Sequence, residues 1–108
     1  MINLDELNKR LLGSNCVLGI SLDMEHKSLK YNLVLTLAES EIEGAKKLII
    51  YFYDVSELRL SEFGGGLTQF MHLKIVRNEF QHDRKVYSLS ELCDEKISFS
   101  FADMDILS

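Results

Sequence analysis

The sequence predicts a β-rich α+β domain with a short N-terminal helix and a mostly antiparallel sheet of about seven strands, either curled or sandwich-like. Three observations predict this fold class. Apolar residues follow helical spacing near the start of the chain, they alternate with polar residues from Cys16 onward, and short polar turns join the alternating segments. Strands joined in this way argue against a parallel α/β sheet. The 108 residues suffice for a single domain, 1–108.

The first predicted element is an amphipathic helix over residues 4–12, where leucines at positions 4, 7, 11 and 12 share one face. Asn3 is a favourable N-cap, because its side chain can accept hydrogen bonds from the free backbone N–H groups of the first turn. Acidic residues in that turn complement the helix dipole, and Gly13 is a natural end.

Period-two patterning predicts the strands that follow. Residues 16–24 and 29–38 should pair as a hairpin around the polar turn 25–28. The run 48–53 is apolar on both faces, which predicts a strand in the middle of a sheet and covered on both sides. Residues 67–76 fit either a strand or a helix. Further short strands are expected at 55–60, 86–89, 97–101 and 104–107, with loops at 39–44 and 78–84 and one helical turn at 90–94, capped by Ser90.

Charge and composition narrow the function classes. The formal net charge is −5, and lysine and arginine never occur in more than pairs, so the chain lacks the basic face that nucleic-acid binding requires. No apolar run approaches the roughly 20 residues of a membrane helix. The first six residues include two acidic side chains, Asp5 and Glu6, and do not follow a signal-peptide pattern. Two cysteines are few for a secreted scaffold. We therefore expect a cytoplasmic protein with free thiols that binds neither nucleic acid nor membrane.

The sequence motifs predict no cofactor, no metal and no catalytic site. Gly64–Gly66 lacks the Gly-Lys-Ser/Thr ending of a phosphate-binding loop and is interpreted as a flexible turn. The histidines, at positions 26, 72 and 82, are too far apart for a local metal site, and those at 26 and 82 lie in predicted turns. His72 is expected on the polar face of its strand. Asp54 is interpreted as the start of a turn.

The cysteines also lack a local signature of catalysis. Cys16 falls on the apolar face of its predicted strand, which indicates a small buried hydrophobic residue, and the pattern leaves Cys93 unassigned.

Acidic residues gather in two places. Glu39, Glu41 and Glu43 alternate along a loop and would project the same way if that segment were extended. Asp94, Glu95, Asp103 and Asp105 lie near the C-terminal end. Such runs are usually solvated faces, and the alternative is a recognition surface for a basic partner, where acidic groups speed encounter and fix register. The three glutamates are the first candidates for binding such a partner.

Two stretches carry a resemblance to a known family. Residues 48–60, Leu-Ile-Ile-Tyr-Phe-Tyr-Asp-Val-Ser-Glu-Leu-Arg-Leu, and residues 97–106, Ile-Ser-Phe-Ser-Phe-Ala-Asp-Met-Asp-Ile, flank the segment 73–75. Together, over roughly residues 16–107, this spacing resembles the small bacterial immunity proteins of polymorphic toxin systems called immunity protein family fifty. The chain contains no tryptophan, so that family's tryptophan-containing opening has no counterpart. The resemblance implies a cytoplasmic, non-catalytic protein that neutralises a cognate toxin by binding it.

These observations lead to one functional prediction and two alternatives. We expect a non-enzymatic protein-binding module, an immunity protein that occludes a basic toxin domain. The first alternative is a structural or assembly protein that self-associates through sheet edges. The second is a small ligand-binding or enzymatic domain with a pocket between helix and sheet.

Overall fold

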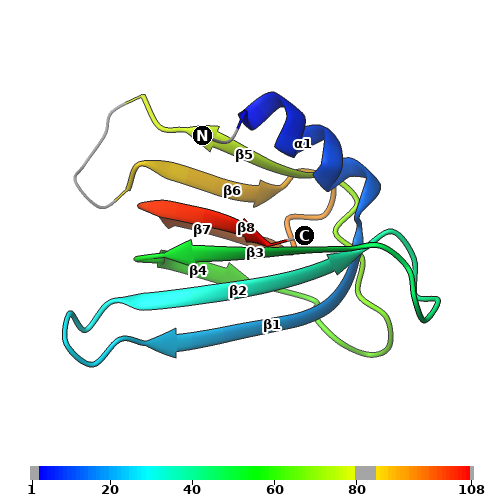
Figure 1. Ribbon diagram of the computed structural model, residues 1–108, viewed down its shortest axis with the longest axis horizontal. Coiled ribbons are helices and arrows are strands. Elements are labelled where there is room, and N and C mark those ends of the chain that lie inside the picture. The colour runs from blue at the N-terminus through cyan, green and yellow to red at the C-terminus, as the bar shows by residue number, and fades with distance from the viewer. Residues whose placement is uncertain (1–2, 80–84, 108) are drawn as a thin grey trace.

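The computed structural model describes residues 3–79 and 85–107, and within them the chain forms one α-helix and eight β-strands (Figure 1). The elements run in the order α1 (Leu4–Gly13), β1 (Cys16–Met24), β2 (Tyr31–Ala38), β3 (Lys47–Tyr53), β4 (Ser56–Leu60), β5 (Leu73–Arg77), β6 (Tyr87–Glu91), β7 (Ile97–Phe101) and β8 (Asp103–Leu107). The predicted fold class, the N-terminal helix and its Asn3 cap are confirmed, with eight strands in place of about seven.

The strands form two four-stranded sheets, each antiparallel throughout. Sheet A has the order β1-β2-β3-β8, and sheet B has the order β4-β7-β6-β5. The two sheets are joined by their own strands. β3 continues into β4, and β7 continues into β8, while β3 pairs with β8 and β4 with β7. Two long bent strands therefore run through both sheets.

The bend between the sheets is fixed at Asp54 and Ala102. Asp54 has a left-handed backbone, with φ 56°, and its N–H donates to Asn32 Oδ1 at 3.2 Å. Its buried carboxylate lies 3.9 Å from Lys30 Nζ. Across the bend, the Ala102 N–H donates to the Tyr53 carbonyl oxygen at 2.9 Å, so the two long strands stay paired as they turn. The predicted turn role of Asp54 is confirmed as a corner between sheets.

The core lies between the two sheets and under α1. Phe52 from sheet A contacts Phe99 and Phe101 from sheet B in edge-to-face geometry, with ring centroids 4.9 and 4.8 Å apart. Leu7 and Leu11 bury the apolar stripe of α1 in the same cluster. Since Phe101 also stacks on Tyr87, an aromatic chain ties three strands together.

Helix α1 also protects one edge of sheet B. It packs beside the edge strand β5, as Figure 1 shows. The Asn8 side chain accepts from the Ile75 N–H at 2.9 Å and donates to the Ile75 carbonyl oxygen at 3.0 Å. A single amide thus satisfies both backbone groups of Ile75, as a neighbouring strand would.

Three local predictions are settled or corrected. Residues 73–77 are a strand, which resolves the ambiguity over 67–76. β3 lies inside its sheet as predicted, but it is not covered on both sides: its residues alternate between buried and solvent-facing positions, and Tyr51 is 37% exposed. The reason is that sheet B covers only one face of sheet A. Among the described elements, none covers the outward side chains of β3.

The third correction concerns residues 90–94, which do not form a helical turn capped by Ser90. Ser90 and Glu91 complete β6, and the turn that follows is held by the Glu91 carboxylate. That carboxylate accepts from the backbone N–H groups of Cys93, Asp94 and Lys96 at 2.9, 2.8 and 3.2 Å. Glu91 is only 1% exposed, so a buried anion performs the capping that was predicted for a serine.

Candidate functional site

The outer face of sheet A is the strongest candidate for a functional surface. Strand register arranges its outward side chains in rows. Tyr51 of β3 lies between Val34 of β2 and Asp105 of β8, while Ile49 of the same strand lies between Thr36 and Leu107. Val34 and Ile49 are partly exposed, and Leu107 is 51% exposed. This surface, which we call the tyrosine face, has an apolar and aromatic centre that no other described element covers.

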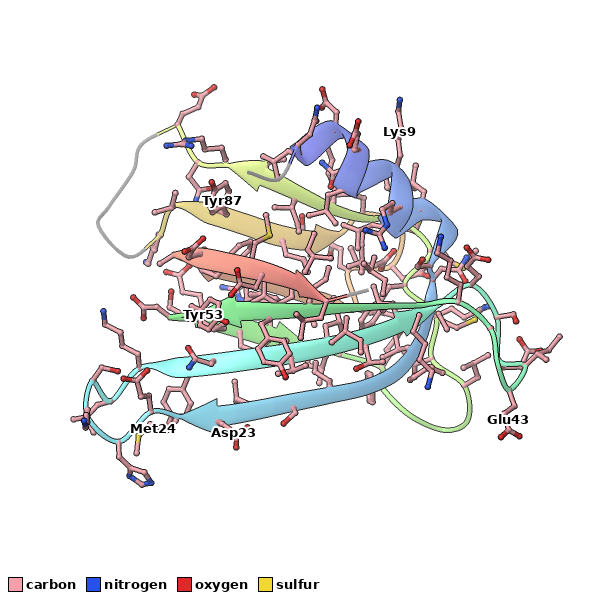
Figure 2. The ribbon with its side chains drawn as sticks, viewed as in Figure 1. Lys9, Asp23, Met24, Glu43, Tyr53 and Tyr87 are labelled. Carbon is pink, nitrogen blue, oxygen red and sulfur yellow. The ribbon has the colours of Figure 1, made fainter. Side chains whose placement is uncertain are left out.

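Aspartates border the tyrosine face. Asp103 pairs with Tyr53 across β3 and β8, and Asp105 lies one row along on the same strand. Asp23 of β1 is exposed at the other border, next to Asn32 of β2 in the register. Figure 2 labels Tyr53 on β3 and Asp23 on β1.

A hydrogen bond links the aromatic and acidic parts of the face. Tyr53 Oη donates to Asp105 Oδ2 at 2.8 Å. That bond, together with burial and the negative charges of Asp105 and Asp103, raises the pKa of Tyr53. Tyr53 is therefore held as a neutral hydrogen-bond donor, and it orients the Asp105 carboxylate at the surface.

The aspartates of the tyrosine face keep their negative charge available. Within residues 3–79 and 85–107, no lysine or arginine forms an ion pair with Asp23, Asp103 or Asp105. Tyrosine rings and carboxylates without ion pairs together suit cationic side chains, because a ring face attracts a cation and a carboxylate attracts a guanidinium or ammonium group. The tyrosine face therefore presents aromatic rings and negative charge side by side.

The structure places the predicted glutamates elsewhere. Glu39, Glu41 and Glu43 are exposed on the β2–β3 connection, and Figure 2 shows Glu43 at the opposite end of the molecule from Asp23. The connection folds back on itself, with the Glu39 N–H donating to the Lys46 carbonyl oxygen at 3.3 Å. The segment is therefore bent, and the extended conformation that would align the three side chains is not present.

The other sequence candidates do not come together. Cys16 is buried as predicted, Cys93 is exposed, and His26 lies in the hairpin turn after β1. His72 precedes β5 in a turn, so its predicted place on the strand's polar face is wrong. His82 and most of the predicted turn 78–84 lie outside the described residues. Among the residues that the structure describes, no three histidine, cysteine or carboxylate side chains are grouped to hold a metal ion.

Gly64–Gly66 form an exposed turn, and all three glycines have positive φ. The interpretation of this segment as a turn is confirmed.

The outer face of sheet B offers a second, polar surface. A hollow of about 340 Å³ is lined by Arg59, serines of β6 and β7, and two glutamates. Beside it, Lys85 forms an ion pair with Glu57. The hollow's lining carries one positive and two negative side chains, and its described residues include neither histidine nor cysteine. Charges of both signs therefore lie on this surface.

Comparison with known proteins adds no relative. The chain matches no protein-family model, no curated protein and no solved structure. The resemblance to immunity proteins therefore stays a prediction. In the part of the chain that the structure describes, no helix has the length and apolar character needed to span a membrane.

One feature of the sequence points to the tyrosine face, although the alternation of residues alone does not reveal which strands form it. Asp103 and Asp105 alternate with Met104 and Ile106, which places both carboxylates on one side of β8. Register then brings them beside the tyrosines of β3. The apolar run of β3 concealed this arrangement, because a strand that is apolar on both faces usually has both faces covered.

Proposed function

We propose that this chain is a non-enzymatic, cytoplasmic binding protein that covers a basic partner with the tyrosine face, in the manner of an immunity protein occluding a toxin. The observation that carries the proposal is the uncovered aromatic centre with three bordering aspartates that have no ion-pair partner among the described residues. Aromatic residues dominate the binding energy at protein interfaces, and charges at the border speed association.

The partner is expected to carry lysine and arginine around an apolar contact. Tyr51 would insert at the centre, and Asp103 and Asp23 would meet the basic rim. The chain's net charge of −5 also attracts a positively charged partner at long range. Occlusion requires contact area and charge and needs no catalytic group.

The test is co-expression of the chain with the protein encoded beside its gene, followed by binding kinetics at two salt concentrations. A one-to-one complex is expected. Tyr51→Ala should weaken it by about 30-fold, since central aromatic residues contribute about 2 kcal/mol or more. Asp103→Lys should slow association at low salt.

Glu43→Lys is the matched control, because it makes the same charge change at the far end of the molecule. If Glu43→Lys slows association and Asp103→Lys does not, the glutamate loop binds the partner and the tyrosine face does not. If no variant alters binding, or the neighbour does not bind at all, the proposed function is wrong.

A further inference from the structure

Among the described strands, one sheet edge is a regular strand without a paired neighbour along half of its length. Exposed edges of sheets recruit other strands unless charge, a bulge or a covering element prevents it. Three of the four edges among the described strands carry such a device. α1 covers β5 through Asn8, β4 has a bulge with Glu57 at φ 56°, and the five residues of β8 include two aspartates. The fourth edge, β1, has a bulge between Val17 and Gly19 and a single aspartate, Asp23, in the regular strand beyond that bulge.

β1 is already paired along the first half of its free edge. The Val17 N–H donates to the Thr68 carbonyl oxygen at 2.9 Å, and the Phe70 N–H donates to the Asn15 carbonyl oxygen at 2.8 Å. These bonds belong to an antiparallel bridge between Cys16 and Gln69. The bridge ends where β1 has its bulge, between Val17 and Gly19. Beyond it, residues 19–24 continue as regular strand with no described neighbour on that side.

The backbone groups of this second half can be assigned to their sides. The Glu25 N–H donates toward β2, to the Lys30 carbonyl oxygen at 2.8 Å. N–H groups alternate in direction along an antiparallel strand, and the register from Gly19 to Met24 is unbroken. The N–H groups of Ile20, Leu22 and Met24 therefore point away from β2, toward solvent.

The side chains at this edge define what could pair with it. Leu22 and Met24 lie on the inner side of the sheet, because the register sets Leu22 opposite the buried Leu33, yet they are 48% and 38% exposed. Asp23 lies on the outer side and borders the tyrosine face. An added strand would place every second side chain against leucine and methionine and the intervening ones beside a carboxylate.

We propose that residues 19–24 of β1 bind an extended segment of the partner by strand addition, and that this segment alternates apolar with lysine or arginine residues. The segment would continue the line of residues 68–70 and extend sheet A by one strand. Backbone hydrogen bonds would supply affinity, and the alternation would supply specificity. Only the basic character of the segment rests on the proposed function, and the free edge does not.

The test uses a blocked synthetic peptide, Val-Lys-Val-Arg-Val-Lys-Val, and the full chain. Peptide binding is measured by NMR titration, and amide hydrogen exchange is measured with and without saturating peptide. Exchange at Leu22 and Met24 should slow at least tenfold, while Ser21 and Asp23, which already bond to β2, should change little. The same peptide with every residue N-methylated should bind at least tenfold more weakly, because neither of its edges can donate backbone hydrogen bonds.

Protein variants give a second readout. Leu22→Lys should reduce peptide affinity about tenfold, and Leu12→Lys, an equally exposed leucine on α1, should not. Asp23→Lys should likewise reduce peptide affinity about tenfold, and Glu43→Lys, which makes the same charge change elsewhere, should not. All four side chains are exposed, so the variants should fold.

Strand addition would be overturned by unchanged exchange at Leu22 and Met24 or by equal binding of the N-methylated peptide. It would also be overturned by concentration-dependent protection of this edge without peptide, which would identify a second copy of the chain as the occupant. Peptide-induced NMR shifts confined to the tyrosine face would also overturn it while leaving the proposed function intact. Conversely, protection of the edge by the peptide with no binding of the neighbouring protein would reject the proposed function alone.

Discussion

Replacing Glu91 by glutamine should destabilise the protein although the two side chains have nearly the same shape. The carboxylate accepts three backbone hydrogen bonds at 2.8 to 3.2 Å, and Glu91 is 1% exposed. Glutamine keeps one oxygen acceptor and turns an N–H₂ group toward the remaining backbone donor. Hydrogen bonds to a charged group contribute about 1.5–3 kcal/mol each, so Glu91→Gln should cost about 2 kcal/mol. In a domain of this size that lowers Tm by roughly 8–16 °C.

The same contacts make the effect pH-dependent. Burial acts to raise the pKa of Glu91, but the backbone N–H groups of Asp94, Lys96, Cys93 and His72 outweigh it, so the pKa is lowered. A lowered pKa means that the stabilisation is fully present above the unfolded value, about 4.3, and is lost as pH falls through the folded value. The difference between wild type and Glu91→Gln should therefore be constant from about pH 8 to pH 5 and shrink below pH 4.

Urea unfolding followed by circular dichroism at pH 7 and at pH 3.5 measures both effects. Glu95→Gln is the matched control, because Glu95 lies in the same turn with its side chain in solvent. It should change the free energy of unfolding by less than about 0.5 kcal/mol. Equal effects of the two substitutions at pH 7, or a difference that grows in acid, would refute the capping role of Glu91.

Three further outcomes are expected. Asn8→Ala should cost about 1–2 kcal/mol in urea unfolding, since it leaves the N–H and carbonyl of Ile75 unpaired at an edge under α1; a loss below 0.3 kcal/mol would contradict the edge-capping role. Leu29→Gly should raise Tm by a few degrees, because Leu29 is 66% exposed and holds a left-handed φ of 61°, which costs a leucine about 1 kcal/mol; a lower Tm would argue against strain there. In native protein, a thiol reagent should modify Cys93 quickly and Cys16 only after unfolding, and fast modification of both would contradict the burial of Cys16.

Local sequence signals were sufficient for most of the fold. The Asn3 cap and leucine spacing define α1, and period-two alternation locates β1, β2 and β7. These features depend on neighbours within a few residues, which the sequence displays directly. The hairpin turn after Met24 was predicted for the same reason.

Two features could not be predicted because distant residues decide them. Whether the outward side of β3 is covered depends on how far sheet B overlaps sheet A, which no local pattern encodes. The tyrosine face requires the register between β3 and β8. The turn after β6 is a different case, because its cap is local: serine is the common capping residue, but the Glu91 carboxylate bonds the N–H groups two, three and five residues further along the chain.

The two bent strands have a consequence for how the protein opens. Because β3–β4 and β7–β8 each belong to both sheets, a shift of one residue in either pair would displace side chains in the two halves of the core at once. Loss of pairing between β3 and β8, or between β4 and β7, would therefore disturb strands that continue into the other sheet. We expect the protected amides of these four strands to exchange together, as one cooperative unit that spans both sheets.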